Sequence, residues 1–249
     1  MTDLPPRAAA RAPAEDELHG PGFFRSIGYA VREIVVIAVM AMVLSLVVKT
    51  WVAQAFYIPS GSMERTLQLD DRVMVSKLHK RFDGVNHGDI VVFKDPGGWL
   101  PPGEQLEARD GWLGTVERSL TFVGLLPDPA DEHLIKRVIG VAGDRVVCCD
   151  DENRLTVNGA PLEEPYIYPG DASSVLKFDI TVPADAVWVM GDHRSDSQDS
   201  RYHPLQGDGT EGSVPLERVV GRAVLTVWPF TRVTTLSNHA EVFSAVPAP

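Results

Sequence analysis

Cysteine is nearly absent from this sequence: of 249 residues only two are cysteines, Cys148 and Cys149, and they are adjacent. Two cysteines are too few for a disulfide framework, and their spacing matches no common zinc site. We interpret them as buried residues of a strand. The alternative is a strained vicinal disulfide or a redox pair.

Positive charge is also scarce, with 23 lysine and arginine residues against 34 aspartate and glutamate residues and a formal net charge of −11. Nucleic-acid binding requires clustered basic side chains, so this balance argues against nucleic acid as a partner. Lysine is rare, which makes any lysine within an apolar stretch conspicuous. Otherwise the composition, 44% hydrophobic and 23% charged, is that of an ordinary folded protein.

One long apolar run extends from Ile34 to Ala53 and is interrupted near its end by Lys49. Its length, about twenty residues, is that of a helix that crosses a bilayer. Lys49 and Trp51 are placed where interfacial side chains occur. We therefore predict a transmembrane anchor at residues 32–54, with the lipid bilayer as a partner.

The orientation of the anchor follows from the charges before it. Arg25 and Arg32 are opposed only by Glu33, and arginines in a short flanking segment favour the cytoplasm. This predicts a disordered cytoplasmic tail at residues 1–31, and an extracytoplasmic domain at residues 55–249 of a single-pass plasma-membrane protein. The rival interpretation is a cleaved secretory signal, because Ala-Gln-Ala at residues 53–55 satisfies the cleavage rule. The long segment before the apolar run favours the retained anchor.

After the anchor, short runs rich in valine and isoleucine alternate with turn signals such as Asn158-Gly159 and Pro169-Gly170. Many short strands with few helices predict a mainly β domain, a β-barrel or sandwich. The stretch at about 95–133, with a predicted helix at 115–126, is interpreted as an insertion. The expected strands are Ala55–Pro59, Arg72–Leu78, Asp89–Phe93, Leu134–Val141, Arg145–Cys149, Arg154–Val157, Val187–Met190 and Val219–Trp228.

The first of three chemically notable segments contains Ser60 and Ser62, which alternate with Pro59 and Gly61 just after the anchor and a predicted strand. Glycine allows a sharp turn that can project a hydroxyl into a cleft. Taken alone, the segment is better interpreted as an ordinary turn, because turns use proline, serine and glycine.

The second segment places Lys136 on a predicted strand, on the same face as Leu134 and Val138. Burial among aliphatic side chains disfavours the charged form and lowers a lysine pKa from about 10.4 towards about 7–8, where the amine can act as a base. Taken without other context, the segment favours the alternative, an edge-strand lysine that keeps its charge in water.

The third segment, at residues 190–201, is dense in polar groups and is by itself compatible with a solvated loop. A calcium loop built from its aspartates lacks the EF-hand spacing and the terminal glutamate, and a zinc site built from histidines is weakly supported. We expect no metal and no cofactor. The residues considered for these two sites are Asp192, Asp196, Asp199, His193 and His203.

Together the segments have the order and the sequence form of one family: the chain resembles the bacterial type I signal peptidases from Phe56 to about Trp228. Residues 58–67 look like the nucleophile motif of that family, residues 88–93 like the strand after it, residues 136–144 like the base motif, and residues 191–201 like the last conserved box.

The resemblance implies a signal-peptidase-like β domain behind a transmembrane helix. It also implies a serine endopeptidase that removes signal peptides from exported preproteins after Ala-x-Ala-like sites through an acyl-enzyme. Ser62 would be the nucleophile and Lys136 the general base. Ser60 with the Ser62 backbone N–H would form the oxyanion hole, and Ser197 would orient the lysine amine. By the same analogy, Asp192 with Arg137 and Asp199 with Arg201 are supporting ion pairs, and the substrate pocket residues are Phe56, Ile58, Met63, Leu67 and Ile135.

The sequence departs from the family pattern at a few loop positions. Arg65 replaces a usual proline, Asp70 stands where glycine normally precedes Asp71, and His193 and Ser195 replace asparagine and aspartate. These changes bear on loop geometry and leave the serine–lysine–serine set intact.

Three other functions are compatible with parts of the sequence. A Ser-His-Asp protease using Ser62 with His193 or His203 has no supporting spacing. A self-cleaving repressor of the LexA type would need a helix-turn-helix and no anchor. An inactive anchored β-domain that only binds secreted partners would not need the serines and the lysine.

Overall fold

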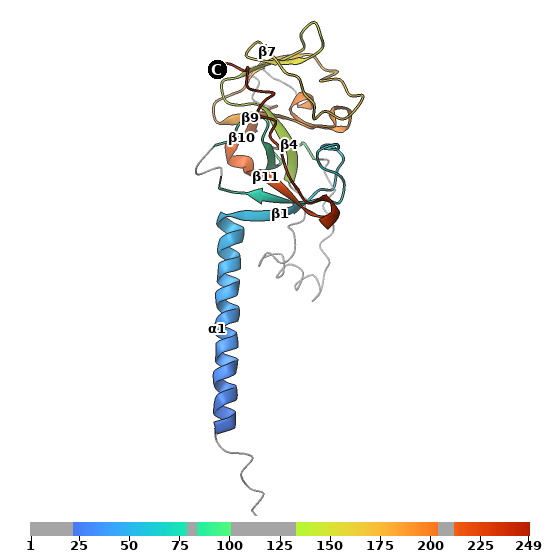
Figure 1. The fold of residues 1–249 in the computed structure, drawn as a ribbon. Helices are drawn as coiled ribbons and strands as arrows, with labels where there is room; N and C mark the ends of the chain where they lie inside the picture. Colours follow the sequence, from blue (N-terminus) through green and yellow to red (C-terminus); the bar gives the residue numbers. More distant parts are fainter. Residues whose placement is uncertain (1–21, 79–83, 101–132, 204–211) are drawn as a thin grey trace, which may run out of the picture. The chain divides into compact units, whose positions relative to one another are not determined.

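The computed structural model describes residues 22–78, 84–100, 133–203 and 212–249. By its internal contacts the chain divides into two units, residues 1–44 and residues 45–249. The first unit contains most of the long helix, and the second contains all of the strands found in these described ranges (Figure 1).

The helix, α1, extends over Gly22–Trp51. Its segment Ser26–Trp51, 26 residues with a mean hydropathy of 2.5, is long and apolar enough to cross a membrane. Apolar side chains along it, such as those of Ile34 and Met40, are exposed, which suits lipid rather than water. The helix begins before the expected start at residue 32, so residues 22–31 of the expected disordered tail are helical. Residues 1–21 lie outside the described part.

The main sheet has the strand order β1-β2-β11-β3-β4-β9-β10, with β12 paired to β11. All its pairings are antiparallel, and β11 joins the two halves by pairing with both β2 and β3. Its strands are β1 (Ala53–Tyr57), β2 (Arg72–Ser76), β3 (Ile90–Lys94), β4 (His133–Gly140), β9 (Ala186–Met190), β10 (Val214–Pro215), β11 (Val219–Trp228) and β12 (Thr234–Thr235).

A smaller sheet of order β7-β6-β5-β8 is inserted between β4 and β9. Turns separate its strands, and short 3-10 helices follow β9, β10 and β11. The strands are β5 (Arg145–Cys148), β6 (Leu155–Val157), β7 (Ala160–Pro161) and β8 (Phe178–Thr181). The 3-10 helices are η1 (Arg194–Asp196), η2 (Ser200–Tyr202), η3 (Leu216–Arg218) and η4 (Phe230–Arg232).

The mainly β prediction is confirmed, and every strand expected from the sequence is present with small changes at its ends. The strands that were missed, β7, β8, β10 and β12, have two to four residues each, too few to show an alternating pattern. The predicted helix at 115–126 and most of the insertion at 95–133 fall outside the described residues.

The core consists of three apolar clusters. One lies around Trp188 and the smaller sheet, one contains Phe93 and the fully buried valines of β9, and one joins β1 to β3 and β4. The third cluster bears most directly on the candidate site, because it contains Ile58 and Met63, which lie on either side of Ser62 in the chain.

The two cysteines form a disulfide with each other at the end of β5. Cys148 is a buried strand residue, as expected, but the vicinal disulfide that we considered as the alternative is the state that the structure shows. A sequence pattern cannot reveal the disulfide, because a cysteine that is buried in a strand can be either free or bonded to its neighbour.

Candidate active site

Ser62 lies in the turn that follows β1. The chain reverses there through backbone hydrogen bonds from Glu64 N to the Gly61 carbonyl (2.9 Å) and from Leu67 N to the Met63 carbonyl (2.8 Å). Met63 and Leu67 are fully buried and anchor this turn in the core. Ser62 is thereby held with only 5% of its surface exposed, as a positioned side chain rather than a mobile loop residue.

Lys136 reaches this serine from the middle of β4. Its Nζ donates a 2.6 Å hydrogen bond to Ser62 Oγ, although the residues are 74 positions apart. On β4 Lys136 pairs with Val91 of β3, and only 2% of its surface is exposed. The edge-strand alternative, in which the lysine keeps its charge in water, is therefore wrong.

Burial lowers the pKa of Lys136 from 10.5 to about 8, although the nearby carboxylates of Asp199 and Asp192 oppose the change. At neutral pH about a tenth of the amine is then unprotonated, against less than one part in a thousand for an exposed lysine. A neutral amine in contact with a hydroxyl can accept its proton, so the pair has the chemistry of a base and a nucleophile.

Ser60 provides a second hydroxyl beside that of Ser62. Its Oγ lies 3.4 Å from Ser62 Oγ, and Ser60 is exposed. That this hydroxyl donates to an oxyanion, together with the Ser62 backbone N–H, stays a prediction.

Ser197 directly follows η1 and is buried. Its hydroxyl donates a 2.7 Å hydrogen bond to Asp199 Oδ2. With its hydrogen engaged, the Ser197 oxygen can only accept, and a protonated or neutral lysine amine is a donor. That Ser197 orients Lys136 stays a prediction.

Gly191 allows Ser197 and Ser62 to approach each other. A Cβ on Gly191 would overlap the Ser197 side chain and would lie 2.5 Å from the Ser62 carbonyl oxygen. His193 N also donates to that carbonyl at 3.1 Å. The absence of a side chain at position 191 therefore sets the spacing between the turn that contains Ser62 and the segment that contains Ser197.

We expect Gly191→Ala to lower kcat/KM for preprotein cleavage about 100-fold, since a shift of the order of 1 Å between catalytic groups has a cost of this size. Gly28→Ala, at a helical position with open space around it, is the matched control. Cleavage kinetics and thermal unfolding are measured on the same samples. An alanine variant with normal kinetics would show that this spacing is unimportant.

Two buried ion pairs lie near Ser62 and Lys136, which we call the dyad. They are the pairs that the family resemblance implied. Arg137 donates from Nε and Nη2 to the Asp192 carboxylate at 2.8 and 2.7 Å, and both side chains are fully buried. Arg201 Nε lies 2.8 Å from Asp199 Oδ1. Burial by itself would raise the pKa of Asp199, but Arg201 and the hydrogen bonds from Gly191 and Ser197 more than offset it, so the pKa is lowered and the carboxylate stays ionised.

The residues expected to line a substrate pocket come together in one apolar cluster. Each is at most 7% exposed, so they are part of the core rather than projecting into solvent. Their role in binding substrate stays a proposal. They are Phe56, Ile58, Met63, Leu67 and Ile135.

Sequence reasoning missed a second layer of polar contacts. Arg194 forms a buried ion pair with Glu164 at 2.6 Å, and the Arg137 guanidinium lies 4.2 Å from the centre of the Tyr166 ring. Thr66 donates to Asp192 at 2.5 Å. These partners are far apart in the chain, and no local pattern marks Glu164 or Tyr166 as neighbours of the site.

Two of the four departures from the family pattern, Arg65 and Asp70, fall at unusual backbone conformations. Arg65 has φ +82° and Asp70 has φ +67°, in the region that favours glycine. Proline requires φ near −65°, so proline could not adopt the conformation of Arg65. Asp70, where glycine is usual, accepts a hydrogen bond from the Tyr57 hydroxyl.

His193 and His203 are not placed as catalytic bases. His193 Nδ1 lies 3.3 Å from the Gly61 carbonyl and 3.4 Å from Glu64, with its ring stacked on Tyr168. His203 stacks on Trp99. Within the described segments, no group of three or more histidine, cysteine or acidic residues is arranged to hold a metal ion.

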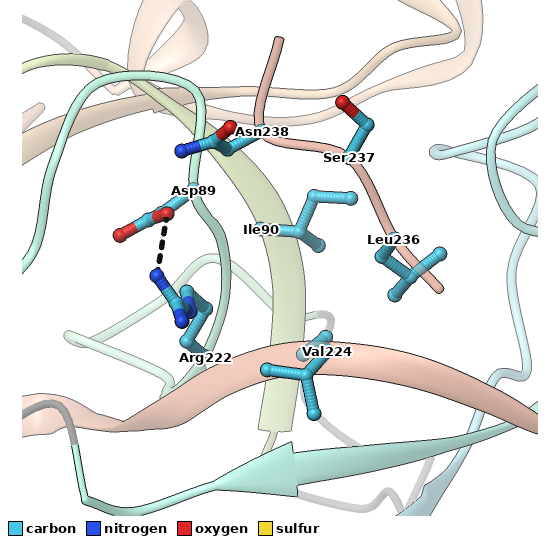
Figure 2. Close-up of a pocket in the computed structure, with 8 residues that line it drawn as sticks. Asp89, Ile90, Arg222, Val224, Leu236, Ser237 and Asn238 are labelled. Atoms are coloured by element: carbon cyan, nitrogen blue, oxygen red, sulfur yellow. Dashed lines mark hydrogen bonds and ion pairs between the residues drawn. The ribbon is translucent and has the colours of Figure 1, made fainter. Parts of the chain in front are cut away.

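A hollow of about 350 Å³ lies between β3, β11 and the chain that follows β12. Figure 2 shows its one ion pair, Arg222 to Asp89 at 3.4 Å, beside the apolar side chains of Ile90, Val224 and Leu236. Neither Ser62 nor Lys136 lines it. It is therefore distinct from the dyad.

The model of one protein family, described as signal peptidase, peptidase S26, matches residues 31–228. The chain belongs to the signal peptidase family. The match includes the apolar helix from Val31 onward and all the strands that carry the dyad, and membership makes the chain a serine endopeptidase.

Individual relatives agree with the family model. The chain is 41% identical over 218 residues to signal peptidase I of Mycobacterium tuberculosis. The alignment covers 81% of this chain and 74% of that protein. It is 40% identical over 227 residues to a probable signal peptidase I of Mycobacterium leprae, covering 82% and 78%. A solved signal peptidase I from Enterococcus faecalis aligns with a TM-score of 0.34 and 22% identity, over 55% of this chain and 95% of that chain.

Family membership supports removal of signal peptides from preproteins, and the apolar N-terminal helix supports a single-pass membrane protein. The self-cleaving repressor and the binding-only domain are set aside by the same finding.

Proposed function

We propose that this chain is a membrane-bound endopeptidase that cleaves signal peptides after Ala-x-Ala-like sites through an acyl-enzyme on Ser62. The observation that supports this most is the 2.6 Å hydrogen bond between the buried Lys136 amine and Ser62 Oγ. A lysine that is nearly inaccessible to water and in contact with a serine hydroxyl is arranged for proton transfer.

In the acylation step, neutral Lys136 takes the proton of Ser62 as Oγ attacks the carbonyl carbon of the scissile bond. The tetrahedral oxyanion receives hydrogen bonds from the Ser62 backbone N–H and the Ser60 hydroxyl, each worth about 2.7–4 kcal/mol of barrier. The C–N bond then breaks, and the leaving amine takes the proton from Lys136.

In the deacylation step, Lys136 accepts a proton from water as the water oxygen attacks the ester. The ester bond to Ser62 breaks, and Oγ recovers its proton from the lysine. The same amine therefore acts as base and acid in both halves of the reaction, which requires a pKa near the working pH.

The substrate is proposed to bind as an extended strand. β9 pairs with β4 only from Arg137 onward, and among the described strands β1 pairs only with β2. This leaves an edge of β1 and the first part of β4 available for backbone hydrogen bonds. Phe56 of β1 and His133 of β4 have ring centres 5.2 Å apart, so the two strands are neighbours here.

We further propose that α1 is a retained anchor, with the N-terminus in the cytoplasm and the catalytic domain outside. Ala53 and Ala55 lie within β1 and are paired with Ser76 and Met74 of β2. Cleavage after Ala55 would require this strand to leave the sheet, which favours retention over processing. A tethered protease meets membrane-bound signal peptides at a raised effective concentration.

The test is acylation of Ser62 by a serine-reactive acylating probe, followed over a range of pH. Because the pKa of Lys136 is lowered to about 8, the neutral fraction grows as pH rises through that value. We expect the acylation rate to increase about tenfold per pH unit below pH 8 and then to level off. The readout is the rate of labelled protein formation, located by peptide mass spectrometry.

Ser62→Ala is the control and is expected to give no labelling. A rate that is flat from about pH 6 to about pH 10 would contradict a lysine base. Labelling at another serine in the wild-type chain would contradict the assignment of the nucleophile.

A further inference from the structure

A second hollow, of about 470 Å³, lies where α1 ends. Its lining includes Trp51 from α1, Lys77 just after β2, Lys94 at the end of β3, and Glu217 and Arg218 from η3. We call it the cationic hollow. All of these residues belong to the second unit of the chain.

The cationic hollow has the opposite charge sign to the protein as a whole. It contains three basic side chains and one acidic one, in a chain whose formal net charge is −11. Two of the six lysines of the sequence line it, and Lys49, in the last turn of α1, is a third nearby. Clustered cations in an otherwise acidic protein attract an anion.

Part of this charge is held in place. The Lys77 ammonium donates to the Lys49 carbonyl at 3.0 Å and to Gln54 Oε1 at 2.6 Å, so its position is fixed against the end of α1. Lys94 and Arg218 are exposed. The hollow therefore combines one anchored positive charge with two that can close around a ligand.

The position along the chain indicates which anion is available. Trp51 is the last residue of the apolar segment and is 52% exposed. Tryptophan at the end of a spanning helix sits at the level of the lipid headgroups, where phosphates are concentrated. We propose that the cationic hollow binds the headgroup of an anionic phospholipid. The inference rests on α1 spanning the membrane, as proposed above.

The same contacts predict selectivity. Lys94 and Arg218 can both donate to a phosphate, and Trp51 can pack against the glycerol region. A zwitterionic headgroup would bring its own cation towards these side chains, whereas phosphatidylglycerol brings none. The site therefore prefers phosphatidylglycerol to phosphatidylcholine.

The test uses the full-length chain and native mass spectrometry with phosphatidylglycerol and phosphatidylcholine. We expect the wild-type chain to bind phosphatidylglycerol more tightly. Lys94→Gln and Arg218→Gln each weaken that binding about fivefold. Glu217→Gln strengthens it, because the only acidic side chain among the named lining residues becomes neutral. Lys177→Gln, which removes an exposed lysine that does not line the hollow, leaves it unchanged.

Equal affinity for the two lipids would overturn the inference, as would an effect of Lys177→Gln equal to that of Lys94→Gln. Preprotein cleavage by the wild-type chain is also measured in vesicles of phosphatidylglycerol and in vesicles of phosphatidylcholine. Normal cleavage without a lipid preference in binding rejects the inference about the cationic hollow alone, and absent cleavage in both kinds of vesicle counts against the proposed function.

Discussion

Replacing Lys136 with alanine is expected to reduce kcat/KM for preprotein cleavage by about 10⁴-fold or more. The variant loses the buried amine that donates to Ser62 Oγ, which we propose to be the proton acceptor of both half-reactions. The measurement is cleavage of a purified preprotein at a fixed pH near 8.

Lys136→Arg separates the role of a base from that of a charge. A guanidinium stays protonated at any usable pH, so this variant keeps a cation in place but cannot accept a proton. We expect it to be as inactive as Lys136→Ala. Substantial activity in the arginine variant would show that the lysine acts electrostatically and would refute the base assignment.

Two matched controls accompany these variants. Lys177 is an exposed lysine, and Lys177→Ala should cleave normally. His193→Ala should retain most activity, since the His193 ring contacts the Gly61 carbonyl and Glu64. The reverse pattern, with an active lysine variant and an inactive histidine variant, would favour the Ser-His-Asp interpretation.

Replacing Asp192 with alanine is expected to lower the free energy of unfolding by about 3–5 kcal/mol. Arg137 is fully buried, and the Asp192 carboxylate is the only anion that its Nε and Nη2 contact in the described segments. The Gly88 and Ser237 carbonyls bind Nη1 but carry no charge. The variant would therefore leave an uncompensated cation inside the domain.

Thermal unfolding of the full chain checks this prediction, with an expected fall in Tm of about 10 °C or more. Asp179→Ala is the control: it removes the partner of Arg145 from a pair whose side chains are 63% and 51% exposed. Water solvates Arg145 in either case, so little change in Tm is expected. Equal shifts of Tm in the two variants would mean that the burial of the Arg137–Asp192 pair does not add to the cost of removing its carboxylate.

The strands and the dyad could be read from the sequence to different degrees. Eight strands, the short β5 and β6 among them, were predictable because runs of valine and isoleucine between turn residues are local signals. The missed strands β7, β8, β10 and β12 were not, and α1 starts earlier than the apolar run suggests because its first turns are of mixed composition. Boundaries of this kind depend on packing and on hydrogen bonds that no short window contains.

The site residues show the same division. Motif resemblance identified Ser62 and Lys136 by number, but only the fold shows that Lys136 is 2% exposed and in contact with Ser62. Local alternation on β4 is equally compatible with a solvated lysine. The Arg194–Glu164 pair had no signal at all, because Glu164 lies in a turn region of unremarkable composition.

The sequence by itself determined that the chain has an apolar stretch long enough to cross a membrane, a mainly β domain and segments that resemble signal peptidase motifs, because each of these can be recognised from residues that are close together in the chain. The tertiary structure decided which charges are buried, that the cysteines are bonded to each other, and that an amine on β4 meets a hydroxyl after β1. The pKa of Lys136 depends on excluding water from all sides, and only the packed sheet brings together the segments that exclude it.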